Sequence, residues 1–480
     1  MEQISKQRHI PECPYAKKCG GCQLQNLPYP DQLAYKQSRV KRLIGGFCHI
    51  EPIIGMENPY HYRNKVQAAF GLDAKRRIIS GVYQSSSHRI VPVDSCLIED
   101  ETADRIIAEI RQMMPDFKMQ AYDERSGTGF LRHVLVKRGF STGEVMVVLV
   151  AATPVFPAQK PFVKKLLALH PEITTVILNV NDRFTSLVLG EREKILFGSG
   201  YIEDVLCGCT FRVSAKSFYQ INPIQTETLY NTAMDFAGLT GCETVLDAYC
   251  GVGTIGLVAS KKAKQVLGVE MNRDAVRDAI SNAKRNGIKN CWFTAADAGE
   301  YMVDMARNGG HADVVFMDPP RAGSDERFLK SLIRLSPKRV VYISCNPDTL
   351  ARDLAILVRG GYKASRAQPV DMFPHTQHVE TVVQLSQQKA STHIKVDLDL
   401  DELDRTTAEA KATYQEIQEY VLKTHGLKVS NLYISQVKRK CGLEMGTNYN
   451  LPKSAEPRVP QCPPAKEAAI MDALRHFQMI

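Results

Sequence analysis

The sequence has no apolar stretch long enough to cross a membrane. No apolar run approaches the roughly 18 residues that a transmembrane helix requires, and residues 1–12 are mostly polar. This pattern excludes a transmembrane helix and predicts that the chain has no signal peptide. We therefore expect a cytoplasmic protein without a membrane partner.

The chain also lacks the secretory context in which disulfide frameworks form. It has 13 cysteines in 480 residues, and cysteines in long chains that are not exported are usually reduced, metal-bound or catalytic. Acidic residues are in modest deficit, which gives a net charge of +9. The excess of basic residues lies mainly in residues 1–215, and it fits a polyanionic partner.

Three of the cysteines lie within ten residues of one another. Cys13, Cys19 and Cys22 have the spacing C-x5-C-x2-C, and the next candidate ligand is Cys96 in Val93–Leu97. Thiolates spaced in this way around glycines can converge on one metal centre, with the fourth ligand brought in by folding. Four sulfur ligands suit a [4Fe–4S] cluster or a structural zinc ion, and the spacing does not distinguish the two. Four unrelated free cysteines are the simpler alternative.

The following part of the chain is predicted to be β-rich. After a helix over 31–43 the pattern indicates strands at 65–71 and 79–84, a hairpin at 130–138 and 144–151, and a pair at 174–179 and 185–189. Basic side chains alternate with tyrosine, phenylalanine and histidine here. Such a surface suits RNA, whose phosphates take the charge and whose unstacked bases take the rings. A solvated sheet face would show the same pattern.

Residues 216–386 alternate between strands and helices. A helix is expected at 224–237, strands at 244–248, 265–269, 291–295, 313–317 and 339–344, and a final hairpin to about 385. This alternation predicts an α/β fold with a doubly wound, mostly parallel sheet. We accordingly divide the chain into residues 1–100 (metal region and start of a central domain), 101–215 (central β domain), 216–386 (sheet domain) and 387–480 (helical extension).

A glycine loop lies between the first strand of this sheet and the next helix. Gly251, Gly253 and Gly256 let the backbone approach a ligand, and Glu270 after the following strand can bind ribose hydroxyls. This fingerprint also fits a nicotinamide dinucleotide. Three further features favour S-adenosylmethionine instead. They are Asp247 before the loop, Asp297 after the third strand, and Asp318-Pro319-Pro320 after the fourth.

The strand at 339–344 is expected to stop near Cys345, because Pro347 in Ser344-Cys345-Asn346-Pro347 cannot extend a central strand. The methylation of an amino group needs no thiol. The methylation of uracil at carbon 5 does, since addition of a thiolate to carbon 6 makes carbon 5 nucleophilic. The proton on carbon 5 must then be removed by a general base, for which Glu380 on the last strand is the best candidate. A buried structural cysteine and a solvated glutamate are the alternatives.

Several stretches together resemble one protein family. They are the cysteine cluster, Phe218–Asn222, Asp247–Gly256, Asp318–Arg321, Ser344–Pro347 and His378–Glu380. From about residue 10 to residue 386 the chain resembles the bacterial 23S ribosomal RNA (uracil-5-)-methyltransferases of the RumA/RlmD type. It departs from them by having Asp-Pro-Pro-Arg in place of Asp-Pro-Ala-Arg. No N-terminal TRAM domain is expected, because only residues 1–12 precede the first cysteine.

The resemblance implies a Rossmann-like class I methyltransferase that acts as a monomer on 23S ribosomal RNA. It implies Cys345 as nucleophile, Glu380 as general base, and a [4Fe–4S] cluster held by the four cysteines. Ribosomal RNA is favoured because the transfer-RNA branch of the family lacks that cluster. A transfer-RNA enzyme and a non-catalytic ribosome assembly factor are the alternatives. The contacts with S-adenosylmethionine that it implies come from Gln220, Tyr249, Thr254, Glu270, Asp297 and Asp318.

The segment 387–480 lies outside this resemblance. Thr406 and Glu409 form a capping box for one helix, Ser430 caps a second that ends in Lys438–Lys440, and Pro463-Pro464 begins a third. Two helices across a short turn with a basic end are typical of a helix-turn-helix. A charge-balanced packing or interaction domain fits the sequence as well.

Overall fold

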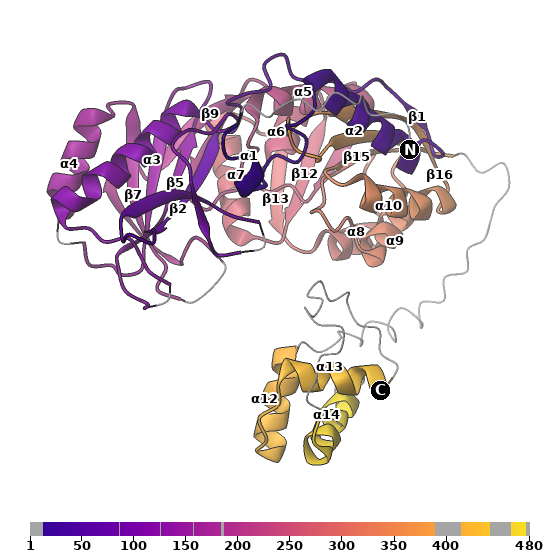
Figure 1. The fold of residues 1–480 in the computed structure, drawn as a ribbon. Helices are drawn as coiled ribbons and strands as arrows, with labels where there is room; N and C mark the ends of the chain where they lie inside the picture. Colours follow the sequence, from indigo (N-terminus) through magenta and orange to yellow (C-terminus); the bar gives the residue numbers. More distant parts are fainter. Residues whose placement is uncertain are drawn as a thin grey trace. The chain divides into compact units, whose positions relative to one another are not determined.

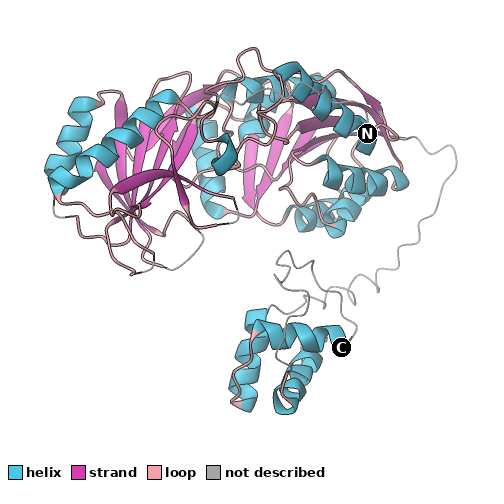
Figure 2. Cartoon of the chain, viewed as in Figure 1, coloured by secondary structure: helices cyan, strands magenta, loops and turns pink. Residues whose placement is uncertain are grey.

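The computed structural model describes residues 13–85, 87–124, 126–156, 158–183, 187–388, 414–441 and 462–476. The chain forms two compact units, Met1–Lys389 and Ala390–Ile480. In the first unit, two sheets with helices packed on them carry most of the secondary structure (Figure 1, Figure 2). The predicted capping box at Thr406 and Glu409 lies outside the described residues.

The larger sheet has eight strands. Its order is β1 (His49–Ile50), β16 (Tyr362–Val370), β17 (Glu380–Gln387), β15 (Arg339–Ser344), β14 (Val314–Met317), β11 (Thr244–Ala248), β12 (Gln265–Glu270) and β13 (Cys291–Ala295). Only β17 runs antiparallel to its neighbours among these strands. The predicted doubly wound, mostly parallel sheet is therefore confirmed. The contribution of β1, from far upstream in the sequence, was not predicted.

Helices cover both faces of this sheet. The helices are α2 (Tyr29–Ile44), α5 (Pro223–Ala237), α6 (Thr254–Ala259), α7 (Arg273–Arg285), α8 (Ala298–Arg307), α9 (Glu326–Leu335) and α10 (Pro347–Arg359). Successive residues of β11 and β14 alternate between two hydrophobic cores, one shared with α5 and α6, the other with α2, α8, α9 and α10. A sheet buried on both faces needs continuous apolar strands, and every residue of β11 and β14 is buried.

The second sheet has seven strands. Its order is β4 (Ile90–Pro92), β3 (Ile78–Tyr83), β2 (Lys65–Leu72), β5 (Leu131–Arg138), β6 (Val145–Ala151), β7 (Ile173–Val180) and β8 (Arg192–Phe197). The helices α3 (Glu101–Met113) and α4 (Gln159–Leu169) and the 3₁₀ turn at Met114–Phe117 complete this region. A short hairpin, β9 (Tyr201–Leu206) with β10 (Cys209–Ser214), packs in the same core as α5 and α6.

One predicted strand in this sheet is wrong. The partner of β7 is β8 at Arg192–Phe197 and not the segment 185–189, of which residues 187–189 lie outside any strand. Asn181 Nδ2 instead donates to the carbonyls of Leu187 and Val188, at 2.7 and 3.0 Å. β8 is an edge strand whose side chains are mostly exposed, so it lacks the apolar alternation by which strands are recognised.

The second unit contains three described helices. They are α12 (Tyr414–His425), α13 (Asn431–Lys440) and α14 (Pro464–His476), and they pack around a small apolar core. In the basic end of α13, Lys438 is buried and Lys440 pairs with Glu467 of α14 at 2.8 Å. These two lysines therefore contribute to packing within the unit. Among the described residues, no helix is long and apolar enough to span a membrane.

Candidate active site

The ends of three parallel strands meet at one edge of the larger sheet. β14 pairs in parallel with both β11 and β15, so the predicted convergence of the three strand ends is confirmed. Asp318 follows β14 directly, and Cys345 follows β15. Because Ser344 pairs with Thr381 across the antiparallel β17, the next positions in that register bring Cys345 opposite Glu380.

The glycine loop after β11 turns through the left-handed region of backbone conformation. Tyr249, Gly251 and Gly253 have φ angles of 68°, 54° and 84°. A β-carbon on Gly253 would lie 3.1 Å from the Phe293 ring, so close packing also requires glycine there. Asp247 Oδ2 accepts a 2.7 Å hydrogen bond from the Gly256 amide and thereby ties the strand to α6.

Carboxyl groups gather around this loop. Burial raises the pKa of Asp247 to about 8, and the nearby charges of Asp318 and Glu270 raise it as well. Burial raises the pKa of Asp318 to about 7. Among the described residues, Asp247 Oδ1 is buried without a hydrogen-bond partner. Buried acids whose pKa values are raised in this way form a site that a cation stabilises. The residues therefore fit S-adenosylmethionine, which carries a sulfonium and an ammonium group.

Cys345 and Glu380 belong to the same electrostatic cluster. Burial raises the pKa of the Cys345 thiol to about 12; the charges of Glu380 and Asp318 raise it further, and Arg321 lowers it. Burial also raises the pKa of Glu380 well above its usual value, with Asp318 adding to the rise and Arg321 opposing it. Asp318, predicted as a cofactor contact, thus acts on both predicted catalytic groups.

Tyr230 on α5 is a member of the site that sequence reasoning missed. Its hydroxyl lies 3.0 Å from Thr254 Oγ1. Burial raises the pKa of this hydroxyl, and a hydrogen bond with the Gln220 side chain opposes that rise. It therefore joins Gln220 and Thr254, two predicted cofactor contacts from separate motifs. Tyr230 occupies a buried, apolar position of an ordinary helix, so the sequence carries no signal for it.

Three other predicted cofactor residues have structural roles as well. Asp297 caps α8 by accepting from the Glu300 amide at 2.9 Å. Tyr249 donates to Ser324 Oγ at 3.4 Å. Glu270 accepts from the amides of Gly251 and Asn272, at 3.2 and 2.9 Å. These contacts fix side chains at the strand ends, and whether they also bind the cofactor stays a prediction.

The predicted metal region is only partly assembled. Cys22 and Cys96, distant in sequence, pack against one small cluster of Met56, Tyr62 and Ile98. Burial and the neighbouring Cys19 and Cys13 raise the pKa of Cys22 to about 12. Within the part of the chain that the structure describes, however, no three or more His, Cys, Asp or Glu side chains form a group that could hold a metal ion. The arrangement therefore does not confirm the predicted centre.

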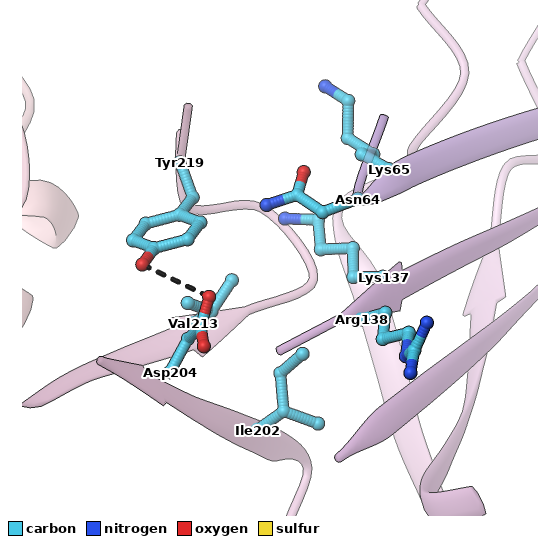
Figure 3. A pocket seen from close by; sticks show the side chains of 8 residues that line it. All are labelled: Asn64, Lys65, Lys137, Arg138, Ile202, Asp204, Val213 and Tyr219. Atoms are coloured by element: carbon cyan, nitrogen blue, oxygen red, sulfur yellow. Dashed lines mark hydrogen bonds between the residues drawn. The ribbon is translucent and has the colours of Figure 1, made fainter. Parts of the chain in front are cut away.

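A pocket lies where the central sheet meets the β9–β10 hairpin (Figure 3). Its lining residues are Asn64, Lys65, Lys137, Arg138, Ile202, Asp204, Val213 and Tyr219. Burial lowers the pKa of Lys137 to about 7, with the charge of Lys65 adding to the effect, and its ammonium donates to two backbone carbonyls. The adjacent Phe218 is 67% exposed. Two cations of this pocket are thus satisfied within the protein, Lys137 by the two carbonyls and Arg138 by an ion pair with Asp100 at 2.6 Å.

The fold and the site define an α/β methyltransferase whose cofactor loop adjoins a thiol and a carboxyl group. The comparison with protein families agrees. The chain belongs to the tRNA (uracil-5-)-methyltransferase family, whose model matches residues 28–388. It is thus an S-adenosylmethionine-dependent RNA methyltransferase of the uracil-5 type, similar to the RumA/RlmD enzymes that its motifs resemble.

Similar proteins cover most of the chain. A protein of Halalkalibacterium halodurans named as an uncharacterized RNA methyltransferase is 43% identical over 390 residues, 80% of this chain and 85% of its own. One of Clostridium acetobutylicum is 45% identical over 386 residues, 79% and 84% of the two chains. The Pyrococcus abyssi tRNA (uracil-54, C5)-methyltransferase, solved with S-adenosyl-L-homocysteine, has 29% identity and a TM-score of 0.64. That match covers 76% of this chain and 86% of the other.

Proposed function

We propose that this enzyme forms 5-methyluridine in 23S ribosomal RNA, with Cys345 as nucleophile and Glu380 as general base. The carrying observation is that the strand register brings Cys345 opposite Glu380 at the ends of adjacent strands, where the charge of Asp318 raises the pKa of both groups. A thiol and a carboxyl group in one desolvated cluster are the two groups that uracil C5 methylation requires.

The proposed roles follow from the chemistry of uracil. The Cys345 thiolate adds to carbon 6 and forms a C–S bond, and the electron pair of the C5–C6 double bond makes carbon 5 nucleophilic. S-adenosylmethionine supplies the electrophilic methyl group that carbon 5 takes. Glu380 then removes the proton from carbon 5, the double bond re-forms, and the C–S bond breaks to release the thiolate.

The proposed cofactor site is the acidic loop region. Gly251 and Gly253 give the backbone close approach, and the buried carboxyl groups of Asp247 and Asp318 favour a cation. The remaining proposed contacts are Gln220, Tyr249, Thr254, Glu270 and Asp297. Titration calorimetry with S-adenosyl-L-homocysteine tests this site, and Asp247→Asn should weaken binding more than the substitution of the exposed Asp304 by asparagine.

Two variants test the catalytic assignment by what each leaves behind. Cys345→Ala should yield neither product nor covalent species. Glu380→Gln should still add to uracil and transfer the methyl group, then stall before proton removal. The expected product is a denaturation-resistant protein–RNA adduct that carries the transferred methyl group, seen by gel electrophoresis with a radiolabelled cofactor. Normal turnover by Cys345→Ala would overturn the mechanism and favour a non-catalytic role for the thiol.

The substrate has one specific rival. The family is described by transfer-RNA methylation, and the Pyrococcus abyssi relative is a transfer-RNA enzyme by name. Ribosomal RNA is proposed because the cysteine-rich segment is typical of the ribosomal branch. Mass spectrometry of nucleosides from the 23S RNA and transfer RNA of a strain lacking the gene distinguishes the two substrates. Loss of 5-methyluridine from transfer RNA alone would exclude the ribosomal assignment, and loss from neither RNA would favour an assembly factor.

We further propose that Cys13, Cys19, Cys22 and Cys96 hold a [4Fe–4S] cluster. The support is the C-x5-C-x2-C spacing and the common packing of Cys22 and Cys96. Anaerobically purified protein should contain iron and acid-labile sulfide. Cys22→Ser should lose both, whereas Cys48→Ser, which replaces a partly buried cysteine elsewhere, should retain them. Stoichiometric zinc without iron would exclude the cluster.

A further inference from the structure

The loop between β16 and β17, residues 371–379, leads directly into the proposed general base. Val370, before the loop, pairs with Glu380, after it. Most of the loop is buried, including Asp371, Pro374 and His375. Since buried backbone carbonyls need hydrogen-bond partners, the groups that satisfy this loop also determine where its end, and therefore Glu380, lies.

The first half of the loop is held by α2 and α5. Lys36 and Asp371 form an ion pair at 2.5 Å in which neither side chain is exposed, and Lys36 also donates to the Phe373 carbonyl at 3.0 Å. Tyr29 donates to the second oxygen of Asp371, likewise at 3.0 Å. From α5 and its cap, Gln225 Nε2 and Asn222 Nδ2 donate to the carbonyls of Asp371 and Met372, each at 3.0 Å.

The second half is held from the cysteine-rich side of the chain. The Tyr62 hydroxyl donates to the Pro374 carbonyl at 3.0 Å, and the Leu24 amide donates to the His375 carbonyl at 2.9 Å. Tyr62 is 1% exposed and belongs to the cluster against which Cys22 and Cys96 pack. The same tyrosine therefore belongs to the apolar cluster of the cysteine-rich region and contacts the loop with its hydroxyl.

The loop contains a backbone conformation that its own sequence does not favour. His375 has a φ angle of 66°, in the left-handed region that side chains other than glycine rarely adopt. Gln32 accepts from the His375 amide at 2.9 Å, and its Nε2 lies 3.2 Å from the ring Nδ1. Such a conformation persists only when surrounding contacts over-determine it. We conclude that these contacts from outside the loop help to fix its shape, together with the loop's own hydrogen bonds from Thr376 to the Phe373 carbonyl.

We propose that Tyr62 is a positioning residue that transmits the fold of the cysteine-rich segment to Glu380 through the loop 371–379. This inference rests on the proposed role of Glu380 as general base. With the Tyr62 hydrogen bond in place, the loop holds the carboxyl group where it can take the proton from carbon 5. Without it, the ring still fills the core but the Pro374 carbonyl loses its donor, and the loop end shifts or fluctuates.

The test is Tyr62→Phe, compared with Tyr362→Phe. Tyr362 is also buried and also donates to a proline carbonyl, that of Pro337, at 3.0 Å, so the control removes the same kind of bond elsewhere. The substrate is 23S RNA, with transfer RNA in parallel, from a strain lacking the gene grown on [5-³H]uridine. Methyl incorporation reports transfer, and tritium release reports proton removal, in a single turnover.

Tyr62→Phe should slow tritium release about five- to tenfold, the effect expected for one lost hydrogen bond, while methyl incorporation and the KM for RNA stay unchanged. Methylated adduct should accumulate transiently. Tyr362→Phe should show neither effect. Equal rates of both steps in Tyr62→Phe and wild type, or equal slowing of both steps in the two variants, would overturn the proposal. Should Tyr62→Phe not fold, Tyr29→Phe gives the same readout.

A failure of the underlying function has a different signature. If the wild-type enzyme releases no tritium from either RNA, the proposed reaction is wrong. If the wild type releases tritium normally and Tyr62→Phe matches it, only the positioning role is wrong.

Discussion

Cys345, the proposed nucleophile, lies in surroundings that disfavour its reactive form. A thiol is nucleophilic as thiolate, yet burial and two neighbouring acids raise the pKa of this one to about 12. Since the native state keeps this proton more tightly than the unfolded chain, the thiol stabilises the fold below its unfolded pKa near 9. That contribution is lost as the pH rises through about 12. Arg321 is the opposing influence, because its charge favours the thiolate.

The first prediction concerns this arginine. Arg321→Gln should slow alkylation of Cys345 by iodoacetamide at any pH between about 7 and 10, because a higher thiol pKa leaves less thiolate. In wild type the rate should rise about tenfold per pH unit across this range, measured by mass spectrometry of the Cys345 peptide.

Arg327→Gln is the matched control. Arg327 is an exposed arginine of α9 that pairs with Glu300 at 3.1 Å and does not contribute to the thiol pKa. Its substitution should leave the alkylation profile of Cys345 unchanged. If the two arginine variants behave alike, the charge of Arg321 does not govern the thiol.

At the scale of the element, the loop between β11 and α6 combines conformational strain with close packing. Gly251 and Gly253 both have left-handed backbones, but only Gly253 is enclosed. A β-carbon at Gly251 would meet nothing within 4 Å, whereas one at Gly253 would lie 3.1 to 3.2 Å from Phe293 and Ala279. Alanine substitutions at the two glycines therefore separate the cost of backbone strain from the cost of steric overlap with neighbouring side chains.

The second prediction follows from this difference. Gly251→Ala should lower the free energy of unfolding by about 1–2 kcal/mol through strain alone. Gly253→Ala should lower the free energy of unfolding by at least about 1 kcal/mol more than Gly251→Ala does, because the added methyl group overpacks the site. Urea unfolding measures both values, and titration calorimetry with S-adenosyl-L-homocysteine shows the loss of cofactor affinity. Equal destabilisation by the two substitutions would show that the Phe293 side chain moves aside at no measurable cost in stability.

At the scale of the molecule, the chain consists of two units with separate cores. The C-terminal unit buries its own cluster around Ile417, Ile434 and Ile470. Its ion pair between Lys440 and Glu467 connects α13 with α14. A unit with its own core can unfold independently of the rest of the chain.

The third prediction is that calorimetry of the full chain shows two unfolding transitions. Deleting residues 390–480 should remove one of them and shift the other by less than about 2 °C. The same deletion should leave the rate of methyl transfer to bound RNA unchanged. A large fall in the remaining transition would instead show that the larger unit depends on the smaller one for stability.

The sequence by itself determined most of the larger sheet and which residues lie at the carboxyl ends of its strands. Strands buried on both faces must be continuously apolar, so β11 and β14 could be located within a residue or two. The glycines, Asp318 and Cys345 follow their strands immediately, and parallel strands bring such positions to one edge. Local pattern was therefore sufficient for these residues.

Only the tertiary structure decided what depends on contacts between distant segments. The edge strand β8 was misplaced because its exposed side chains carry no apolar alternation. The Lys36–Asp371 ion pair and the Tyr62 contact join residues more than three hundred positions apart, and neither partner is distinctive in its own segment. Likewise, the pKa of Cys345 depends on which carboxyl groups folding places beside it. The sequence therefore indicated the candidate residues, whereas the charges and buried groups around them depend on contacts that only folding makes.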